Sequence, residues 1–387
     1  MSVTADIVLA GSMETTGASF EVGDLMITGV TSGSDSLDYR LDAGRLDVGV
    51  PISISPVHLV IDYSFRLHNS FNGVLENGLT FAWPYFCGNI YPCKSNPKEG
   101  QSFELTLNGV PVGKEAVYAA SIPADAPSYM VGWAIGEYSY LDLGTTTSGT
   151  LVGVYYRLVN EANAIEGTQH LRDVMDWYER TYGEYIFGEK VASVSVDWGI
   201  GQFGGLEHHP FWHIARESMS DQTGHAHEAA HGWFGNGVRI ACWEDFVLSE
   251  GVASYLAARS LTEVGGEILG NKIWASYSNQ LNRLQSSREN KIAWPDSCNQ
   301  VDIIEDGLFG SAPYMKGAFF FRDVERVVGK DRLDKALREF YMAYKGEYAG
   351  MQDLLDNIMI YTGYDPTDCA NAWLRTASLP VNGICNY

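Results

Sequence analysis

The sequence contains no apolar run that approaches the roughly 20 residues needed by a helix that crosses a bilayer. We therefore expect no membrane span. Basic residues are also scarce, since 26 lysines and arginines stand against 48 aspartates and glutamates and the formal net charge is −22. A chain with this charge repels phosphate backbones, so nucleic acid is excluded as an expected partner. The charge by itself indicates solubility.

Cysteine pairs of the C-x-x-C type, typical of zinc fingers and redox motifs, are absent. The six cysteines form an even set that allows three disulfides, although six buried thiols remain an alternative; they are Cys87, Cys93, Cys242, Cys298, Cys369 and Cys385. The chain does not open with a basic segment followed by an apolar stretch, so we expect no intact signal peptide. A secreted or periplasmic location, with the signal already removed, is favoured over the cytoplasm.

The 387 residues predict two domains of an α+β protein. In residues 1–158 apolar and polar side chains alternate in short runs, most clearly over residues 57–68, and Gly, Ser, Asn and Pro separate the runs. This pattern predicts an N-terminal all-β sandwich. Residues 159–387 are predicted to be mainly α-helical, with one strand at residues 190–196. We predict helices over residues 162–182, 221–233, 245–264, 314–328, 331–344 and 351–362.

The most informative pattern is His227-Glu228-Ala229-Ala230-His231, which has the form H-E-x-x-H. Residues four apart on a helix share one face, so both imidazoles can reach one metal ion. Glu228 lies about 100° round the helix, where it can act as general base for a water molecule activated by the metal. Zinc is the ion that suits this set of side chains best.

A catalytic zinc site takes three protein ligands and keeps one position open, so a third ligand is expected downstream. Glu250 is the candidate, at the start of a predicted helix for which Asp245 or Ser249 is a suitable N-cap. The structural alternative is an exposed helical glutamate that binds no metal. We also consider Asp245 and Glu244 as acceptors for the second N–H group of a metal-bound imidazole.

These segments together resemble the aminopeptidase N family of zinc metallopeptidases, the gluzincins that also include leukotriene hydrolase. The likeness lies in residues 227–236, in residues 250–255, which eighteen intervening residues separate from the second histidine, and in residues 127–138 and 371–381. It implies an N-terminal β-sandwich followed by a thermolysin-like catalytic domain that is mainly helical and has a small sheet. The large C-terminal helical domain of the long members has no counterpart here, which implies a short member with a more open cleft.

The resemblance also implies roles for residues that bind substrate. Gly204-Gly205-Leu206-Glu207-His208 is similar to the family segment G-A-M-E-N, an edge strand that binds the substrate backbone. Its glutamate, here Glu207, grips the free α-amino group; Leu206 and His208 depart from the family pattern. A second amine-binding position of the family is occupied here by Trp83, whose indole can instead stack on the substrate or its cation.

Residues 313–318 resemble the family motif Y-x-K-G-A. The resemblance makes Tyr314 the donor of a hydrogen bond to the oxyanion of the tetrahedral intermediate. Of the other histidines, His209 and His213 are expected at the rim of the site or in the core, and His225 points away from the metal because it lies about 200° round the helix from His227.

The sequence thus predicts a zinc-dependent aminopeptidase that acts on peptide substrates. One Zn²⁺ per chain is held by His227, His231 and Glu250, with Glu228 and Tyr314 as catalytic residues. Glu207, Gly204, Gly205 and Trp83 are the predicted substrate-binding residues. The alternatives are a zinc endopeptidase or other hydrolase without specificity for a free amine, and a non-catalytic binding protein on the same scaffold. The sequence gives no indication of the oligomeric state.

Overall fold

The computed structural model describes residues 2–69, 72–81, 86–199, 204–287, 291–300, 302, 308–380 and 385. The chain forms two compact units that interleave along the sequence. The first comprises residues 1–99, 107–119 and 127–136, and the second comprises residues 100–106, 120–126 and 137–387. A boundary after residue 158 stays a prediction, and residues 137–158 are grouped with the second unit. Among the described helices none is long and apolar enough to span a membrane.

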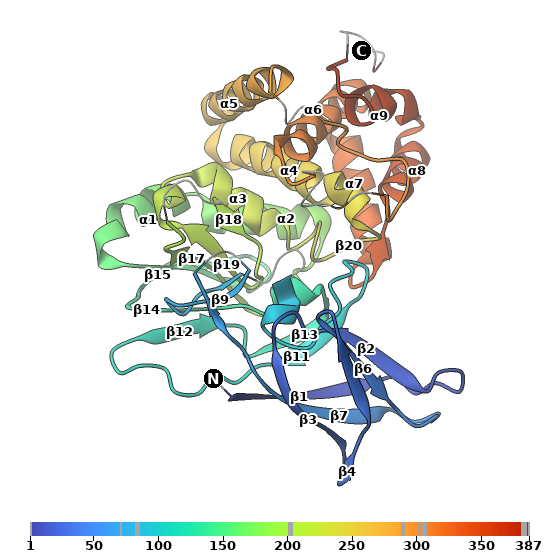
Figure 1. Cartoon of the computed structure of the whole chain (residues 1–387). Helices are drawn as coiled ribbons and strands as arrows, with labels where there is room; N and C mark the ends of the chain where they lie inside the picture. Colours follow the sequence, from blue (N-terminus) through green and yellow to red (C-terminus); the bar gives the residue numbers. More distant parts are fainter. Residues whose placement is uncertain are drawn as a thin grey trace. The chain divides into compact units, whose positions relative to one another are not determined.

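The first unit is built from β-strands (Figure 1). Strand β7 illustrates why it folds this way: Leu59, Ile61 and Tyr63 are buried while the residues between them are more exposed, so one face of the sheet forms a core. One antiparallel sheet has the order β1-β7-β3-β4 and a second has the order β2-β6-β5. Their bounds are β1 Ser2–Leu9, β2 Gly17–Glu21, β3 Met26–Ser32, β4 Asp35–Ser36, β5 Tyr39–Asp42, β6 Arg45–Gly49 and β7 Val57–Ser64.

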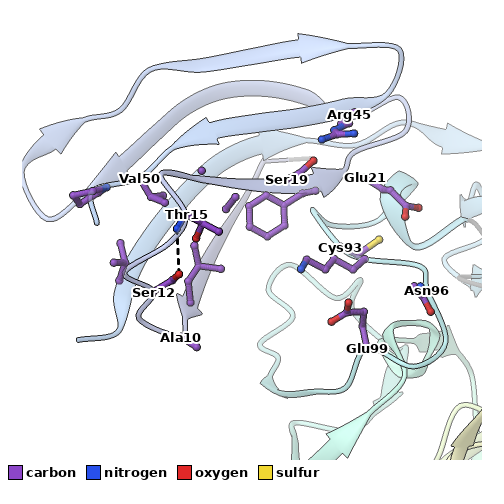
Figure 2. A pocket seen from close by; sticks show the side chains of 17 residues that line it. Ala10, Ser12, Thr15, Ser19, Glu21, Arg45, Val50, Cys93, Asn96 and Glu99 are labelled. Carbon is purple, nitrogen blue, oxygen red and sulfur yellow. Dashed lines mark hydrogen bonds between the residues drawn. The ribbon is translucent and has the colours of Figure 1, made fainter. Parts of the chain in front are cut away.

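Short strands and turns complete the first unit. They are β8 Leu67–His68, β9 Gly73–Leu75 and β10 Thr80–Phe81 in one sheet, the pair β12 Glu115–Tyr118 and β14 Trp133–Gly136, and the 3₁₀ turns η1 Phe86–Asn89 and η2 Ser128–Met130. A pocket of about 640 Å³ opens here, lined by residues from the segments 9–21, 45–57 and 93–99 (Figure 2). None of the predicted site residues that the structure describes lines it.

The second unit is organised around a five-stranded sheet with the order β15-β16-β17-β19-β18. Its strands are β15 Ser139–Thr145, β16 Leu151–Tyr156, β17 Lys190–Val196, β18 Gly205–Leu206 and β19 Phe211–Ala215. The central strands β16, β17 and β19 run parallel and the two edge strands run antiparallel to their neighbours. Six of the seven residues of β17 are buried, as expected for a parallel strand covered on both faces. The predicted strand at residues 190–196 is thus present.

Helices cover this sheet and form the rest of the second unit (Figure 1). They are α1 Glu161–Thr168, α2 Leu171–Tyr182, α3 Gln222–Ala230, α4 Phe246–Gly265, α5 Glu267–Gln285, α6 Ser311–Val328, α7 Lys330–Tyr344, α8 Met351–Thr362 and α9 Thr367–Leu374. The short elements are η3 Leu158–Asn160, η4 Arg216–Ser218, η5 Trp243–Asp245 and the strand pairs β11 Gln101–Glu104 with β13 Ser121–Ala126 and β20 Arg239–Ile240 with β21 Tyr348–Ala349.

Helix α4 is the centre of the helical layer. Residues 246–261 are all buried, and the helix contacts α2, α3, α5, α6 and α8. A helix that is apolar on every side belongs in the interior of a protein. Because Glu250 lies in the second turn of α4, a carboxylate is placed inside the helical layer next to α3 and α6.

Three helical segments differ from the sequence prediction, and one of them, the short helix α9, was not predicted. The single helix expected over residues 162–182 is two helices, α1 and α2, which are interrupted at residues 169–170. Gly167 and Thr168 close α1; the threonine hydroxyl donates to the carbonyl of Ala164, a local bond that competes with helix continuation. Helix α5 was not predicted, although its buried residues Ile273, Tyr277, Leu281 and Leu284 follow helical spacing.

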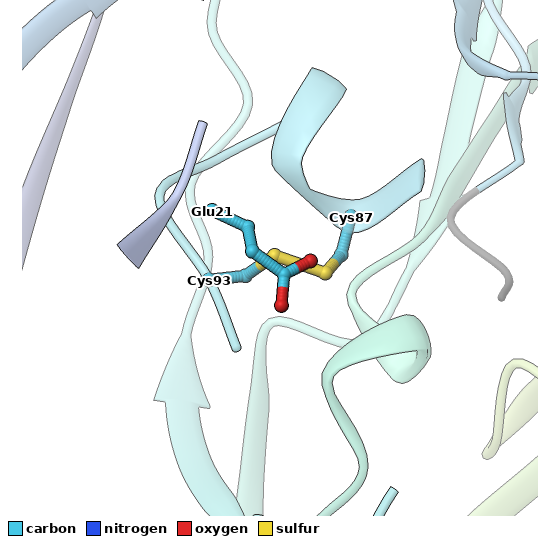
Figure 3. A group of neighbouring side chains, drawn as sticks. All are labelled: Glu21, Cys87 and Cys93. Atoms are coloured by element: carbon cyan, nitrogen blue, oxygen red, sulfur yellow. A yellow bond between two sulfur atoms is a disulfide. The ribbon is translucent and has the colours of Figure 1, made fainter. Parts of the chain in front are cut away.

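All six cysteines are paired, as Cys87–Cys93, Cys242–Cys298 and Cys369–Cys385. Glu21 lies beside the first of these disulfides (Figure 3). Sulfur atoms in a disulfide are not thiolate ligands, so neither this group nor Cys242, Asp245 and Cys298 is a metal site.

Candidate metal centre

Helix α3 carries the H-E-x-x-H pattern. It begins after Asp221, whose carboxylate accepts a hydrogen bond from the amide of Thr223 at 3.0 Å and caps the helix. His231 follows the last helical residue but keeps helical dihedral angles, φ −61° and ψ −18°. The four-residue spacing therefore places His227 and His231 on one face, with their rings 4.8 Å apart.

Glu250 on α4 meets this pair of histidines. Its Oε2 atom lies 2.9 Å from His227 Nε2 and 3.5 Å from His231 Nε2, and the two Nε2 atoms are 3.2 Å apart. Ligand atoms about 2.1 Å from a tetrahedral zinc ion lie about 3.4 Å from one another. The three atoms thus have the spacing of three ligands around a single ion.

The charges of this cluster also call for a cation. Glu250, Glu228 and Glu207 are all at most 6% exposed. The main charged groups that shift their pKa values are histidines and other carboxylates of the same cluster, not lysine or arginine side chains. Burial alone lowers the pKa of His231, but the surrounding carboxylates, Glu250 first, outweigh it and raise that pKa to about 10. For Glu250, burial favours a higher pKa, yet His231 and His227 outweigh it and hold the value at about 2. Without an ion His231 therefore holds a proton, which it would release on binding zinc, because zinc takes ionised carboxylates and neutral imidazoles as donors.

Polar contacts at the Nδ1 atoms orient both imidazoles. His231 Nδ1 donates to the carbonyl of Phe234 at 3.0 Å, and His227 Nδ1 lies 3.4 Å from Ser254 Oγ. These contacts leave each Nε2 atom directed at the common point. Asp245, considered as the acceptor from sequence, instead receives hydrogen bonds from Trp294 Nε1 and the amide of Met351.

The carboxylates of Glu207 and Glu228 lie next to the three candidate ligands. Oxygen atoms of Glu207 and Glu228 and a ring nitrogen of His231 lie within 4.8 Å of one another. Burial is the main cause that raises the pKa of Glu207, to about 7, and the pKa of Glu228 well above its usual range. A carboxyl group with a raised pKa is suited to accept and return a proton near neutral pH.

Edge strand β18 runs beside Glu228. A Cβ atom at Gly205 would lie 2.2 Å from Glu228 Oε1, so only glycine permits this approach of the strand to the carboxylate. The carbonyl of Gly204 accepts a hydrogen bond from the amide of Ala215 on β19. Glu207 follows directly after β18. The structure thus brings Gly204, Gly205 and Glu207 to the cluster, whereas Trp83 lies outside the described residues.

Tyr314 lies in the first turn of α6, next to His227. Its ring stacks on that of His227, with centroids 5.8 Å apart, and meets Phe246 edge-on at 6.0 Å. Burial and the nearby carboxylates, Glu250 first, raise the pKa of Tyr314 well above its ordinary value. The phenol therefore remains protonated and can donate a hydrogen bond into the site.

Two glycines for which the sequence predicted no role bring Tyr314 to the candidate metal ligands. A Cβ atom at Gly251 would lie 2.9 Å from Gly317 Cα, and one at Gly317 would lie 2.5 Å from Gly251 Cα. Helices α4 and α6 consequently touch backbone to backbone beside Glu250. The sequence signal is small: each glycine lies inside a helical pattern, where it costs up to about 1 kcal/mol relative to alanine and needs a packing reason.

Lys316 is a further residue for which the sequence predicted no role. Its side chain is fully buried, and its Nζ atom donates to the carbonyls of Lys291, Thr376 and Ala377 at 2.8, 2.8 and 3.0 Å. Three acceptors match the three protons of an ammonium group. Burial lowers the pKa of Lys316 to about 8. Lys316 fixes α6, and with it Tyr314, to the segment after α9.

His209, His213 and His225, which lie outside the ligand set, are core residues. His225 is hydrogen-bonded to Ser193 Oγ and to the carbonyl of Met219, which agrees with its expected direction away from the metal. His209 and His213 are at most 1% exposed. Burial lowers the pKa of His209 to about 3 and the pKa of His213 well below its usual value, so both imidazoles are neutral.

A sequence model of the Peptidase family M1 domain matches residues 215–373. The chain is similar to Leucine aminopeptidase 2 of Ajellomyces capsulatus, with 25% identity over 72% of this chain and 47% of that protein. It is also similar to the mitochondrial Aminopeptidase 2 of Saccharomyces cerevisiae, with 24% identity over 76% of this chain and 33% of that protein. The chain thus spans about half, or less, of the length of these curated relatives.

Solved structures with the same fold include the M1 zinc metallopeptidase of Deinococcus radiodurans. The TM-score is 0.81 at 16% sequence identity, and the match covers 98% of this chain and 90% of that one. A mutant of the enzyme bound to a Tyr-Ser-Ala substrate gives a TM-score of 0.80 at 18% identity, with 98% and 91% covered. The expected arrangement of a β-rich N-terminal part followed by a helical zinc peptidase domain is therefore confirmed at the level of the fold.

Proposed function

Because this chain carries a peptidase family M1 domain, we propose that the protein is a zinc-dependent aminopeptidase that removes N-terminal residues from peptides. The observation that carries the proposal is the position of Glu207. Its carboxylate lies within 4.8 Å of Glu228 and of the ring nitrogen of His231. A carboxylate so close to the metal ligands can bind an α-ammonium group only when the first peptide bond is at the metal.

His227, His231 and Glu250 would hold one zinc ion per chain. When bound, the ion supplies a Lewis acid that polarises the scissile carbonyl and activates water. Glu228 accepts the proton of the water molecule as its oxygen attacks the carbonyl carbon. It then passes this proton to the nitrogen of the leaving amine, so that one carboxyl group acts first as base and then as acid.

Tyr314 stabilises the negative charge that develops on the carbonyl oxygen. Its hydroxyl is protonated because burial raises its pKa, and its ring is held by His227 and Phe246. Donors of this kind typically contribute about 100-fold to 1,000-fold to turnover. Strand β18 is an edge strand of its sheet, so an extended peptide can add to it.

An oxidising compartment, outside the cell or in the periplasm, is the location we propose. The support is the pairing of all six cysteines in a chain of this size.

One peptide in two forms tests the activity. The protein is incubated with the peptide carrying a free N-terminus and with the same peptide N-acetylated, and the products are followed by mass spectrometry. We expect stepwise loss of N-terminal residues from the free form only, abolished by a chelator and restored by Zn²⁺. Cleavage of the acetylated form at internal bonds would replace the proposal with a zinc endopeptidase, and cleavage of neither form would favour a binding protein.

A further inference from the structure

The turn that follows Glu207 is tied to the end of α3 by two buried side chains. Asn236 and His209 are both fully buried. Asn236 Nδ2 donates to the carbonyl of Glu207 at 2.8 Å, and His209 Nε2 donates to the carbonyl of Glu228 at 2.7 Å. The Asn236 side chain, which follows α3, thus bonds to the main chain at Glu207, and the His209 side chain, which follows Glu207, bonds to the main chain of α3.

Asn236 connects Glu207 with a metal ligand. Its own amide donates to the carbonyl of His231 at 3.1 Å, while its side chain holds the carbonyl of Glu207. One residue thus spans the main chain at His231 and the main chain at Glu207. The bond to His231 comes from the backbone amide of Asn236, so it survives any substitution except proline. The bond to Glu207 comes from the side chain and is lost when the side chain is replaced by alanine.

His209 uses a carbonyl that the helix leaves open. Near the end of α3 the amide of Gly232 donates to Ala229, and the carbonyl of Glu228 lies in the last turn, where helical partners are missing. His209 supplies the donor. Tyr185 Oη lies 2.8 Å from His209 Nδ1 and donates to it, which fixes the tautomer that carries its proton on Nε2. Burial keeps this imidazole neutral, because it lowers the pKa to about 3.

From this geometry we infer that Asn236 and His209 are positioning residues that set the distance from Glu207 to Glu228 and the metal ligands, and thereby fix cleavage at the first peptide bond. The inference rests on the proposed aminopeptidase function. Without the two bonds, the Glu207 segment is held by the short strand β18 and the bond from the amide of His209 to Glu207. A shift of about 1 Å at such a group is enough to lower an enzyme's efficiency up to about 100-fold.

The test measures binding of the α-amine directly. The probes are leucine hydroxamate and N-acetyl-leucine hydroxamate, two metal-chelating inhibitors that differ only in the free amine. The ratio of their inhibition constants is the contribution of the amine, and zinc content is measured in parallel. The variants are Asn236→Ala and His209→Leu. His209→Gln is the conservative variant, because the glutamine amide can donate from the position of Nε2.

Tyr178→Phe is the matched control. The hydroxyl of Tyr178 donates to the carbonyl of Ala226, so this variant also removes a buried hydrogen bond to the main chain of α3, away from the Glu207 segment. We expect the ratio to fall about tenfold in Asn236→Ala and His209→Leu with zinc content unchanged. It should stay at the wild-type value in Tyr178→Phe and recover in His209→Gln.

Several outcomes overturn the inference, and they are distinguishable from failure of the proposed function. A wild-type ratio near one refutes the amine anchor itself and the aminopeptidase proposal with it. A large wild-type ratio that is unchanged in Asn236→Ala and His209→Leu refutes only the positioning role. A ratio that falls together with zinc content, or that falls equally in Tyr178→Phe, assigns the two residues to general stability.

Discussion

Replacing Gly251 with alanine tests whether the backbone contact between α4 and α6 positions Tyr314. The new Cβ atom would lie 2.9 Å from Gly317 Cα and 3.1 Å from the carbonyl oxygen of Pro313. Carbon atoms in contact are about 3.5 to 4.0 Å apart, so α6 must withdraw by roughly 0.6 to 1.1 Å. Overpacking of this kind costs about 1–3 kcal/mol of folding free energy. The displacement should lower turnover by up to about 100-fold through Tyr314.

Helix α3 offers the matched control. A Cβ atom at Gly224 would make an ordinary contact of 3.5 Å with Asp221 Oδ2, so Gly224→Ala should retain turnover and gain up to about 1 kcal/mol from helix propensity. Three quantities are measured. Urea denaturation gives the free energy of unfolding, a peptide with a free amine gives the turnover, and metal analysis gives the zinc content. If the effect passes through the phenol, Gly251→Ala should have little further effect on turnover in a Tyr314→Phe background. Wild-type turnover in Gly251→Ala, loss of its zinc, or full additivity with Tyr314→Phe would each refute the reasoning.

Two further predictions concern Glu228 and His213. Glu228→Gln should keep its zinc and lose nearly all turnover, because the amide cannot accept the proton; more than a tenth of wild-type turnover in a zinc-loaded variant would contradict the assignment. Burial, with a smaller contribution from His208, lowers the pKa of His213 well below 6.5 in the folded state, so the unfolded chain binds the additional proton as pH falls below 6.5. Stability is therefore complete above that pH and declines below it, and His213→Phe should reduce the slope of the unfolding free energy against pH by up to about 1.4 kcal/mol per unit between pH 6 and 5. Equal slopes in urea titrations of the two proteins would show that His213 is protonated in the fold.

The metal cluster was predictable because its geometry is local. Helical spacing determines that His227 and His231 share a face, and the ligand count of zinc requires a third residue such as Glu250. The alternation in residues 57–68 likewise indicates strand structure, which is present as β7 and β8, and the pattern of residues 190–196 indicates the strand that is present as β17. Each of these inferences needs only the period of one element or the chemistry of one ion.

The residues that hold the cluster together were not predictable in this way. Gly251 and Gly317 are 66 positions apart, and their contact depends on how α4 crosses α6. Asn236 was within a recognised segment but had no assigned partner, and His209 was expected only at a rim or in the core. Their roles depend on which carbonyls the end of α3 and the turn after β18 leave available. Such partners come from tertiary packing, which a sequence period does not encode.

The ammonium group of Lys316 has a consequence for the order in which the site matures during synthesis. Two of its three acceptors, the carbonyls of Thr376 and Ala377, lie 60 and 61 residues downstream of Lys316 itself. Before that stretch leaves the ribosome, α6 has a cationic side chain without its full set of acceptors, and burying it then is unfavourable. Tyr314, the proposed oxyanion donor, is therefore expected to reach its final position only after the segment that follows α9 has been made, so that a nascent fragment already able to bind metal would still be a poor peptidase.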